Sequence, residues 1–261
     1  MRGLAGRVAV VTGAGHGIGA AIAARLAEEG VSVLVTDLDA PSAERVAARI
    51  GDSGGRAAWL GVDVRSAEQV DGIAGHAEAA FGAVPSIVVA NAGHQTFHGV
   101  LDLSEAEWRD VFDVNAHGTY LTMRMAARTL PRSGEPGALI AMASIQARLG
   151  SVNYAHYSAS KAAVLSLTKS FALALAPHRV RVNCVAPGVV DTDLWARADR
   201  EMAALRGIPP GVPRRERIAQ VPLGRAGTPA DVAGAVAFLA SADASYITGE
   251  CLHVCGGDVM L

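Results

Sequence analysis

The chain has 261 residues, of which 51% are hydrophobic and 18% are charged, and its formal net charge at pH 7 is −2. This much apolar material is enough for a large buried core, and we expect a single dinucleotide-binding and catalytic domain over residues 1–261. The Lys and Arg residues are scattered rather than gathered into a stripe. These features exclude an electrostatic footprint for nucleic acid, so we expect no nucleic-acid partner.

The apolar segments do not predict a membrane protein. The run at 87–90 is too short to cross a bilayer, and the longer apolar stretch after Lys161 is interrupted by Thr168, Lys169 and Ser170. No signal-peptide pattern stands ahead of the first predicted strand. We therefore expect a soluble, cytoplasmic protein without a membrane partner.

The three cysteines, Cys184, Cys251 and Cys255, are too few for a disulfide framework. An intracellular setting would keep them reduced, and we expect them to serve as small buried hydrophobes. We expect no metal site.

Short β-branched runs alternate with alanine-rich amphipathic stretches along the chain. Nearly continuous apolar runs are typical of parallel strands covered by helices on both faces. We expect strands at 8–12, 31–36, 57–62, 87–90, 139–143 and 180–185. The pattern predicts an α/β fold, a single doubly wound parallel sheet of the Rossmann type with helices on both faces.

Glycines follow the first predicted strand and precede an alanine-rich helix that begins near Ile18. Gly13, Gly15, Gly17 and Gly19 lack side chains, so backbone amides and the helix dipole can approach a pyrophosphate. We expect Gly13, Gly17, Ile18 and Gly19 to bind a cofactor. A tight turn without a ligand is the alternative.

Asp37 closes the second strand about twenty residues after the glycine turn, where a carboxylate can accept hydrogen bonds from a ribose diol. It would also repel a 2′-phosphate, and His16 offers no permanent positive charge in compensation. The cofactor is therefore expected to be NAD. The alternative for Asp37 is an ordinary turn or helix cap, a role that Asp39 could also fill.

Two later strand ends also face the expected cofactor. Asp63, followed by Val64, ends the third strand and is placed for an adenine edge or for capping the next helix. Asn91, Ala92 and Gly93 follow the fourth strand, where small residues let the backbone pass close to a cofactor. The alternative for this last segment is a plain turn.

Two helix starts carry capping signals. Ser104 is followed three residues later by Glu107, and Thr228 by Asp231. Between them, residues 191–222 interrupt the pattern with prolines and a basic cluster, too broken for a core element but with a helical start. Long excursions beyond the carboxyl ends of the strands commonly cover a ligand, so we name 191–222 the substrate loop. A surface insertion without function is the alternative.

Tyr157 and Lys161 stand one helical turn apart, and Ser144 follows the fifth strand. An ammonium beside a phenol favours the phenolate, which gives an acid/base device. In oxidation Tyr157 would take a hydroxyl proton while a hydride leaves for a nicotinamide, and Ser144 would orient the same oxygen.

These residues resemble the short-chain dehydrogenase/reductase family over nearly the whole chain. The resemblance implies a catalytic tetrad of Asn115, Ser144, Tyr157 and Lys161, with Asn115 holding a water that links the lysine to solvent. It also implies cofactor binding by Tyr157, Lys161, Pro187, Gly188, Val190 and Thr192. One departure is Cys255, which stands where the family usually has Asp and which bears on C-terminal packing or subunit contacts.

Polar residues adjoin these motifs and suit a hydroxyl-rich ligand. We expect His94, Gln146, His156 and Trp195 to contact the substrate. A closer resemblance to bacterial sugar-alcohol dehydrogenases of the sorbitol or galactitol type implies NAD-linked oxidation of a polyol, sugar or cyclitol. The alternatives are a ketoreductase of an apolar or carrier-bound substrate, and an NAD-binding regulator without turnover.

Relatives in this family are usually dimers or tetramers, so the resemblance implies a homo-oligomer. Val232, Val236 and Leu239 form an apolar face that would suit a second subunit. A helix buried in the core of one subunit would look the same.

Overall fold

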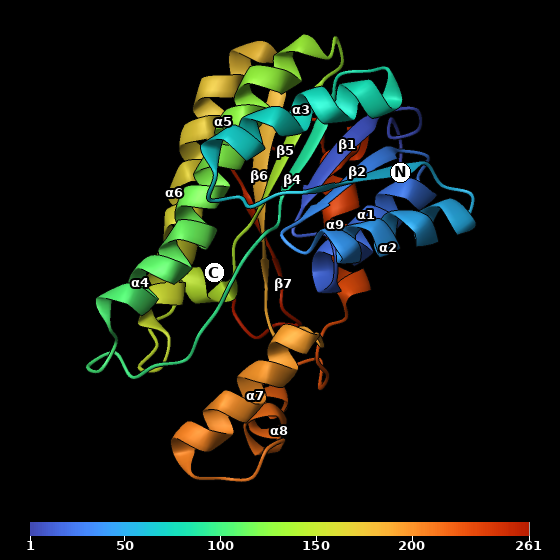
Figure 1. Ribbon diagram of the computed structural model, residues 1–261. Helices are drawn as coiled ribbons and strands as arrows, with labels where there is room; N and C mark the ends of the chain where they lie inside the picture. Colours follow the sequence, from blue (N-terminus) through green and yellow to red (C-terminus); the bar gives the residue numbers. More distant parts are fainter. Residues whose placement is uncertain (261) are drawn as a thin grey trace.

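The computed structural model describes residues 1–260, and its centre is one parallel sheet of seven strands in the order β3-β2-β1-β4-β5-β6-β7 (Figure 1). The strands are β1 (Val8–Thr12), β2 (Ser32–Asp37), β3 (Ala57–Gly61), β4 (Ile87–Ala90), β5 (Gly137–Met142), β6 (Val180–Pro187) and β7 (Cys251–Val254). The predicted fold is confirmed. Six strands match the expected ranges to within two residues at each end, and β7 is added at one edge.

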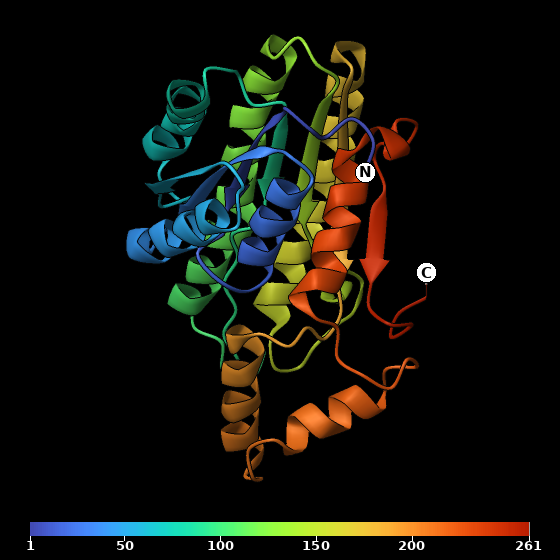
Figure 2. The same cartoon turned by 90° about the vertical axis from the view of Figure 1, so that its right-hand side faces the viewer.

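Helices cover both faces of this sheet (Figures 1 and 2). The helices α1 (Gly17–Glu28), α2 (Ala40–Asp52) and α9 (Pro229–Ala240) pack on one face, whereas α3 (Ala67–Phe81), α5 (Thr119–Thr129) and α6 (Ala155–Leu175) pack on the other. Strand side chains alternate between the two cores: Val11 of β1 joins the first and Val10 the second.

The two predicted capping signals are confirmed at α4 (Glu105–Phe112) and α9. Ser104 and Thr228 each accept a hydrogen bond from the backbone of the third helical residue, and its carboxylate returns the contact. The apolar face of α9 is buried within the same subunit, because Val232, Val236 and Leu239 all belong to the first core. The assignment of that face to a second subunit is therefore wrong, and the core alternative holds.

The helix α6, with its short extension to His178, is long and apolar enough to cross a membrane by length and composition alone. Ser160, Lys161 and Val164 of this helix are buried inside the protein. A share of 33% of its apolar window is buried, so packing on the sheet accounts for part of its apolar character.

The substrate loop begins with a helix, as expected, and a second helix follows the prolines, which was not expected. Residues 191–222 hold two helices, α7 (Asp193–Arg206) and α8 (Val212–Ala219), which extend beyond the carboxyl ends of the strands (Figures 1 and 2). Gly207 ends α7 in a left-handed conformation, and Pro213 lies in the first turn of α8. Asp199 of α7 joins the pair by accepting from the backbone nitrogens of Gly211 at 2.6 Å and Arg214 at 2.8 Å.

Candidate active site

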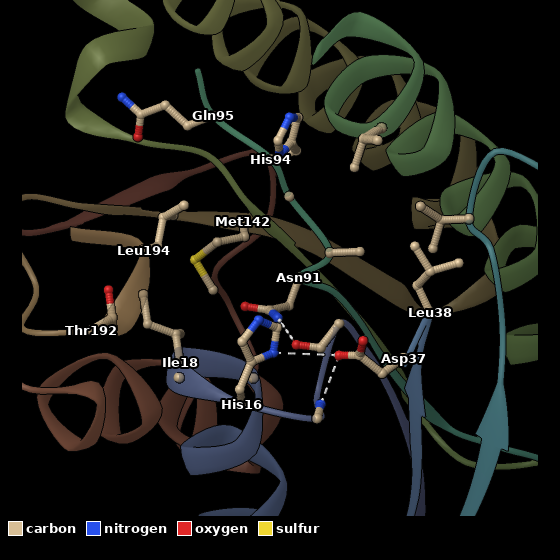
Figure 3. Close-up of a pocket in the computed structure, with 18 of the residues that line it drawn as sticks. His16, Ile18, Asp37, Leu38, Asn91, His94, Gln95, Met142, Thr192 and Leu194 are labelled. Atoms are coloured by element: carbon tan, nitrogen blue, oxygen red, sulfur yellow. Dashed lines mark hydrogen bonds and ion pairs between the residues drawn. The ribbon is translucent and has the colours of Figure 1, made fainter. Parts of the chain in front are cut away.

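A cleft of about 1090 Å³ opens beyond the carboxyl ends of the central strands. The strand order reverses between β1 and β4, and such switch points are where open α/β sheets bind ligands. Figure 3 shows Asp37 and Leu38 on one side of the cleft, with Leu194 and Gln95 on the other. All the residues expected to hold a cofactor line this cleft.

The glycine turn after β1 leaves no room for side chains. Gly13 has a φ of 62°, and a Cβ there would lie 2.7 Å from the Cα of Ala92. A Cβ on Gly19 would collide with the carbonyl oxygen of Gly13. Asn91 fixes the turn by donating from Nδ2 to the carbonyls of Thr12 and Gly13, both at 2.9 Å. The result is a rigid, uncovered backbone at the start of α1, which fits the pyrophosphate of a dinucleotide.

Asp37 is held by its neighbours as an ionised carboxylate. It accepts from the backbone nitrogens of Gly15 at 2.8 Å and Asp39 at 3.0 Å, and the Nδ1 of His16 lies 3.6 Å from its Oδ2. Burial alone would raise the pKa of Asp37, but the contacts with His16, Gly15 and Asp39 together lower it. The same contact with Asp37 raises the pKa of His16. Asp37 thus also serves as the local turn cap that was its alternative role.

Two cations of this region are absent from the predicted site. Arg45 of α2 lines the cleft near Ser42, and Arg65 binds the carboxylate of Asp63 with its Nη2 at 2.7 Å. His16, which was expected to offer no permanent positive charge, is paired with Asp37. The pair with Arg65 lowers the pKa of Asp63. Ser66, and not Asp63, caps α3, so the capping alternative for Asp63 is wrong.

The proposed acid/base residues converge from two elements. Ser144 follows β5, and α6 presents Tyr157 and Lys161 to the same part of the cleft. Lys161 is 3% exposed, and its Nζ lies 5.8 Å from the centre of the Tyr157 ring. The spacing of one helical turn therefore places the ammonium beside the phenol, as expected.

Burial dominates the ionisation of both groups. It raises the pKa of Tyr157, and a hydrogen bond with Ser144 acts in the opposite direction. It also lowers the pKa of Lys161 to about 8. Desolvation of the phenol therefore outweighs its hydrogen bond with Ser144, and stabilisation of the phenolate by Lys161 together with an oxidised nicotinamide stays a prediction.

Asn115 lies in a π-helical turn, Asp113–Gly118, between α4 and α5 and is fully buried. Its Oδ1 accepts from the backbone nitrogen of His94 at 2.7 Å, while its Nδ2 donates to the His94 carbonyl at 2.8 Å and to Ser160 at 3.1 Å. Asn115 does not line the cleft. What its side chain does is clamp the segment that follows β4.

The expected substrate residues divide into two groups. His94 and Trp195 line the cleft, and the Nε2 of His94 lies 3.0 Å from the carboxylate of Asp110. Gln146 and His156 lie outside the lining. His156 is fully buried, where its Nε2 contacts the hydroxyl of Thr96 at 2.8 Å.

Several residues that line the cleft were not among the predicted site residues. The lining also contains Leu38, Ser42, Asp110, Met142, Asp193 and Leu194. Asp110 is in the last turn of α4, and its pairing with His94 draws attention to it. Met142 could have been noticed, because it stands at the carboxyl end of a predicted strand.

Known proteins share this architecture along their whole length. A family model described as Enoyl-(Acyl carrier protein) reductase matches residues 13–258. The crystal structure of a short-chain type dehydrogenase/reductase from Mycobacterium marinum has a TM-score of 0.89 and 35% identity, covering 99% of this chain and 97% of that chain. This chain belongs to the short-chain dehydrogenase/reductase family.

Curated relatives within this family carry different substrates in their names. Galactitol 2-dehydrogenase of Agrobacterium fabrum is 37% identical, over 97% of this chain and 98% of its own. Cis-4-hydroxycyclohexanecarboxylate dehydrogenase of Sinomonas cyclohexanicum is 41% identical, over 96% of each chain. A mouse (3R)-3-hydroxyacyl-CoA dehydrogenase is 37% identical, over 96% of this chain and 95% of its own. The protein is an oxidoreductase of secondary alcohols that uses a nicotinamide cofactor.

Proposed function

We propose that this protein is an NAD-dependent dehydrogenase that interconverts a secondary alcohol on a polyol, sugar or cyclitol with the corresponding ketone. The observation that carries the proposal is the meeting of Ser144, Tyr157 and Lys161 in one cleft with the ionised Asp37. The first three residues support the acid/base step of alcohol oxidation with either NAD or NADP. The choice of cofactor rests on Asp37.

Each acid/base residue has a defined task. Ser144 orients the reacting hydroxyl, and Tyr157 takes its proton in oxidation or returns it in reduction. The nicotinamide supplies hydride transfer and, when oxidised, a positive charge that favours the phenolate of Tyr157. Lys161 adds a further positive charge beside the phenol. We assign Asn115 as a positioning residue that fixes the backbone of His94 and, through Ser160, the start of α6.

The preference for NAD follows from the electrostatics of Asp37. Its carboxylate is 7% exposed and ionised, so a 2′-phosphate beside it would meet a negative charge. A ribose 2′-hydroxyl would instead find an acceptor. His16 is already committed to this carboxylate, Arg65 to Asp63, and Arg45 to Ser42 and Asp39.

The polyol, sugar or cyclitol substrate is supported by polar groups beside the acid/base residues. His94, with Asp110 behind it, and Gln95 line that end of the cleft. Polar groups of this kind in a cleft favour substrates whose hydroxyls pair with them. Similarity to a galactitol dehydrogenase points in the same direction. His156 and Gln146 now take no part in this proposal, because they lie outside the lining.

The second candidate is a ketoreductase of an apolar or carrier-bound substrate. Leu194 and Trp195 of α7 and Met142 give one side of the same cleft an apolar character. Similarity to the mouse (3R)-3-hydroxyacyl-CoA dehydrogenase supports it. On both readings we infer a soluble cytoplasmic enzyme that forms a homodimer or homotetramer.

The test is reduction of NAD and of NADP by the purified protein across polyols, cyclitols, sugars and hydrophobic secondary alcohols. Tyr157→Phe is the control, because it removes one hydroxyl and little volume. NAD reduction by polyols or cyclitols that depends on Tyr157 is the expected result. Preference for apolar alcohols would favour the ketoreductase, and preference for NADP would contradict the role of Asp37.

A further inference from the structure

Two thiols face each other at one edge of the sheet, away from the cleft. Cys184 of β6 and Cys251 of β7 are paired in register, and both contribute to one small apolar cluster under α6. Neighbouring strands lie about 4.8 Å apart, which falls within the Cα separations of about 4.4–6.8 Å that a disulfide spans. Both thiols are free in this structure.

The two thiols differ in exposure and in charge environment. Cys184 is buried in the cluster, whereas Cys251 is partly exposed on the edge strand. The contact with Cys251, together with burial, raises the pKa of Cys184. The contact with Cys184 lowers the pKa of Cys251; Arg148 and Lys169 act in the same direction, while burial and Glu250 oppose it. Cys251 is therefore the thiol that meets solvent, and it is the more acidic of the two.

We propose that Cys184 and Cys251 form a reversible redox pair that a peroxide closes into a disulfide between β6 and β7. The thiolate sulfur of Cys251 attacks one oxygen of the peroxide, the O–O bond breaks, and hydroxide leaves with the electron pair. The sulfenic acid on Cys251 is then attacked by the sulfur of Cys184. The S–S bond forms, the S–O bond breaks, and water leaves with the thiol proton.

The position of the pair permits this closure. β7 is a short edge strand with β6 on one side only, so a small movement toward β6 disturbs no further strand. Cys255 is not a competing partner, because it lies beyond the end of β7, where its Sγ contacts the carbonyl oxygen of Val259 at 3.4 Å. Because cytoplasmic thiols are kept reduced, disulfides there are transient, which suits a bond made by peroxide and broken by a dithiol.

The experiment treats the purified full chain with hydrogen peroxide, then measures intact mass and free thiols after denaturation. The expected result is a loss of about 2 Da and a fall from the three thiols of the sequence to one, both reversed by dithiothreitol. Cys255→Ser should still lose about 2 Da, while Cys184→Ser and Cys251→Ser should not. Neither Cys184 nor Cys251 lines the cleft, so turnover of all three reduced variants reports correct folding.

Three results would overturn the pair. These are no loss of thiols at any peroxide concentration that leaves the fold intact, a disulfide that includes Cys255 or a second chain, and stable oxygen addition at Cys251 with Cys184 still free. Peptide mapping without reduction distinguishes all three from the expected Cys184–Cys251 peptide. Because the readout is mass, it does not depend on which substrate the enzyme accepts.

Discussion

The Nζ of Lys161 donates to the carbonyl oxygen of Met142 at 2.8 Å and thereby ties α6 to the end of β5. Ser144 lies just beyond Met142, and Tyr157 lies one turn before Lys161. One hydrogen bond therefore sets the relative position of the strand end and the helix that meet in the cleft. The ammonium is buried to make this contact, and that burial lowers its pKa to about 8.

Lys161→Met should reduce turnover strongly and yet raise the free energy of unfolding near pH 7. The pKa of Lys161 is lowered from 10.5 to about 8, so the unfolded chain binds the proton more tightly and the buried charge costs roughly 3 kcal/mol below pH 8. The gain in the variant should shrink as the pH rises from about 8 to about 10.5.

Urea unfolding of both proteins at pH 7 and pH 10 checks this. The hydrogen bond to Met142 is also lost in the variant, which lowers its stability at every pH. The pH dependence is therefore the decisive quantity, and a difference that stays constant from pH 7 to pH 10 would contradict the assignment.

Tyr157→Phe should lower kcat at least about 100-fold, because general acid/base catalysis contributes about 10²–10⁴. Cofactor affinity should stay within about twofold, since the ring and its packing remain. Steady-state kinetics and quenching of protein fluorescence by NAD separate the two effects. Near-normal kcat in a variant that binds NAD would mean that another group moves the proton.

Ser144→Ala should shift the pH profile of alcohol oxidation to higher pH. Burial raises the pKa of Tyr157, and the hydrogen bond from Ser144 counteracts this rise. Oxidation needs the phenolate, so the rate climbs with pH toward the pKa of Tyr157, and removal of the bond moves that climb upward. The measurement is kcat/KM between pH 6 and pH 10.5, with Ser144→Thr as the variant that keeps a hydroxyl. An unmoved profile in Ser144→Ala would show that the bond does not form.

Asp37→Ser should weaken the discrimination against NADP. The substitution removes the ionised carboxylate but leaves an oxygen that can accept from Gly15 or Asp39. We expect the ratio of kcat/KM for NAD to that for NADP to fall at least about tenfold, as a loss of about 1.4 kcal/mol of discrimination implies. Asp39→Ser is the matched control on the exposed neighbour. Equal ratios in all three proteins would remove Asp37 from cofactor choice.

Asp199→Ala should loosen the substrate loop without affecting the cofactor. The carboxylate of Asp199 is buried and accepts two backbone hydrogen bonds at the start of α8, a contact worth about 1 kcal/mol. We expect faster proteolysis within 191–222 and a higher KM for the alcohol, with the KM for NAD nearly unchanged. Glu201→Ala, on the same helix, is the control. An equal rise in both KM values would indicate a general loss of folding.

Local chemistry made much of this site predictable. Short spacings in the sequence predict the glycine turn with Asp37 and the pair of Tyr157 and Lys161. A strand-to-helix turn positions the first group, and one helical turn brings the second together. The second helix of the substrate loop is hard to predict because prolines surround its start, although Pro213 in a first helical turn costs little. The burial of His156 was also out of reach, because it depends on Thr96 arriving from another segment. The register between β6 and β7, which places Cys184 beside Cys251, could likewise not be predicted, because it is a property of the folded sheet.

The π-helical turn at Asp113–Gly118 also determines which changes in chain length the protein tolerates between α4 and α5. A π-helical turn holds about one residue more than an α-helical turn, so removing one residue here would restore ordinary winding and leave α5 facing the same core. An added residue would instead rotate α5 by about 100° and turn Leu121 and Met123 away from the core they now fill. Insertions should accordingly be tolerated at the tip of the substrate loop, around Gly207, and rejected between α4 and α5.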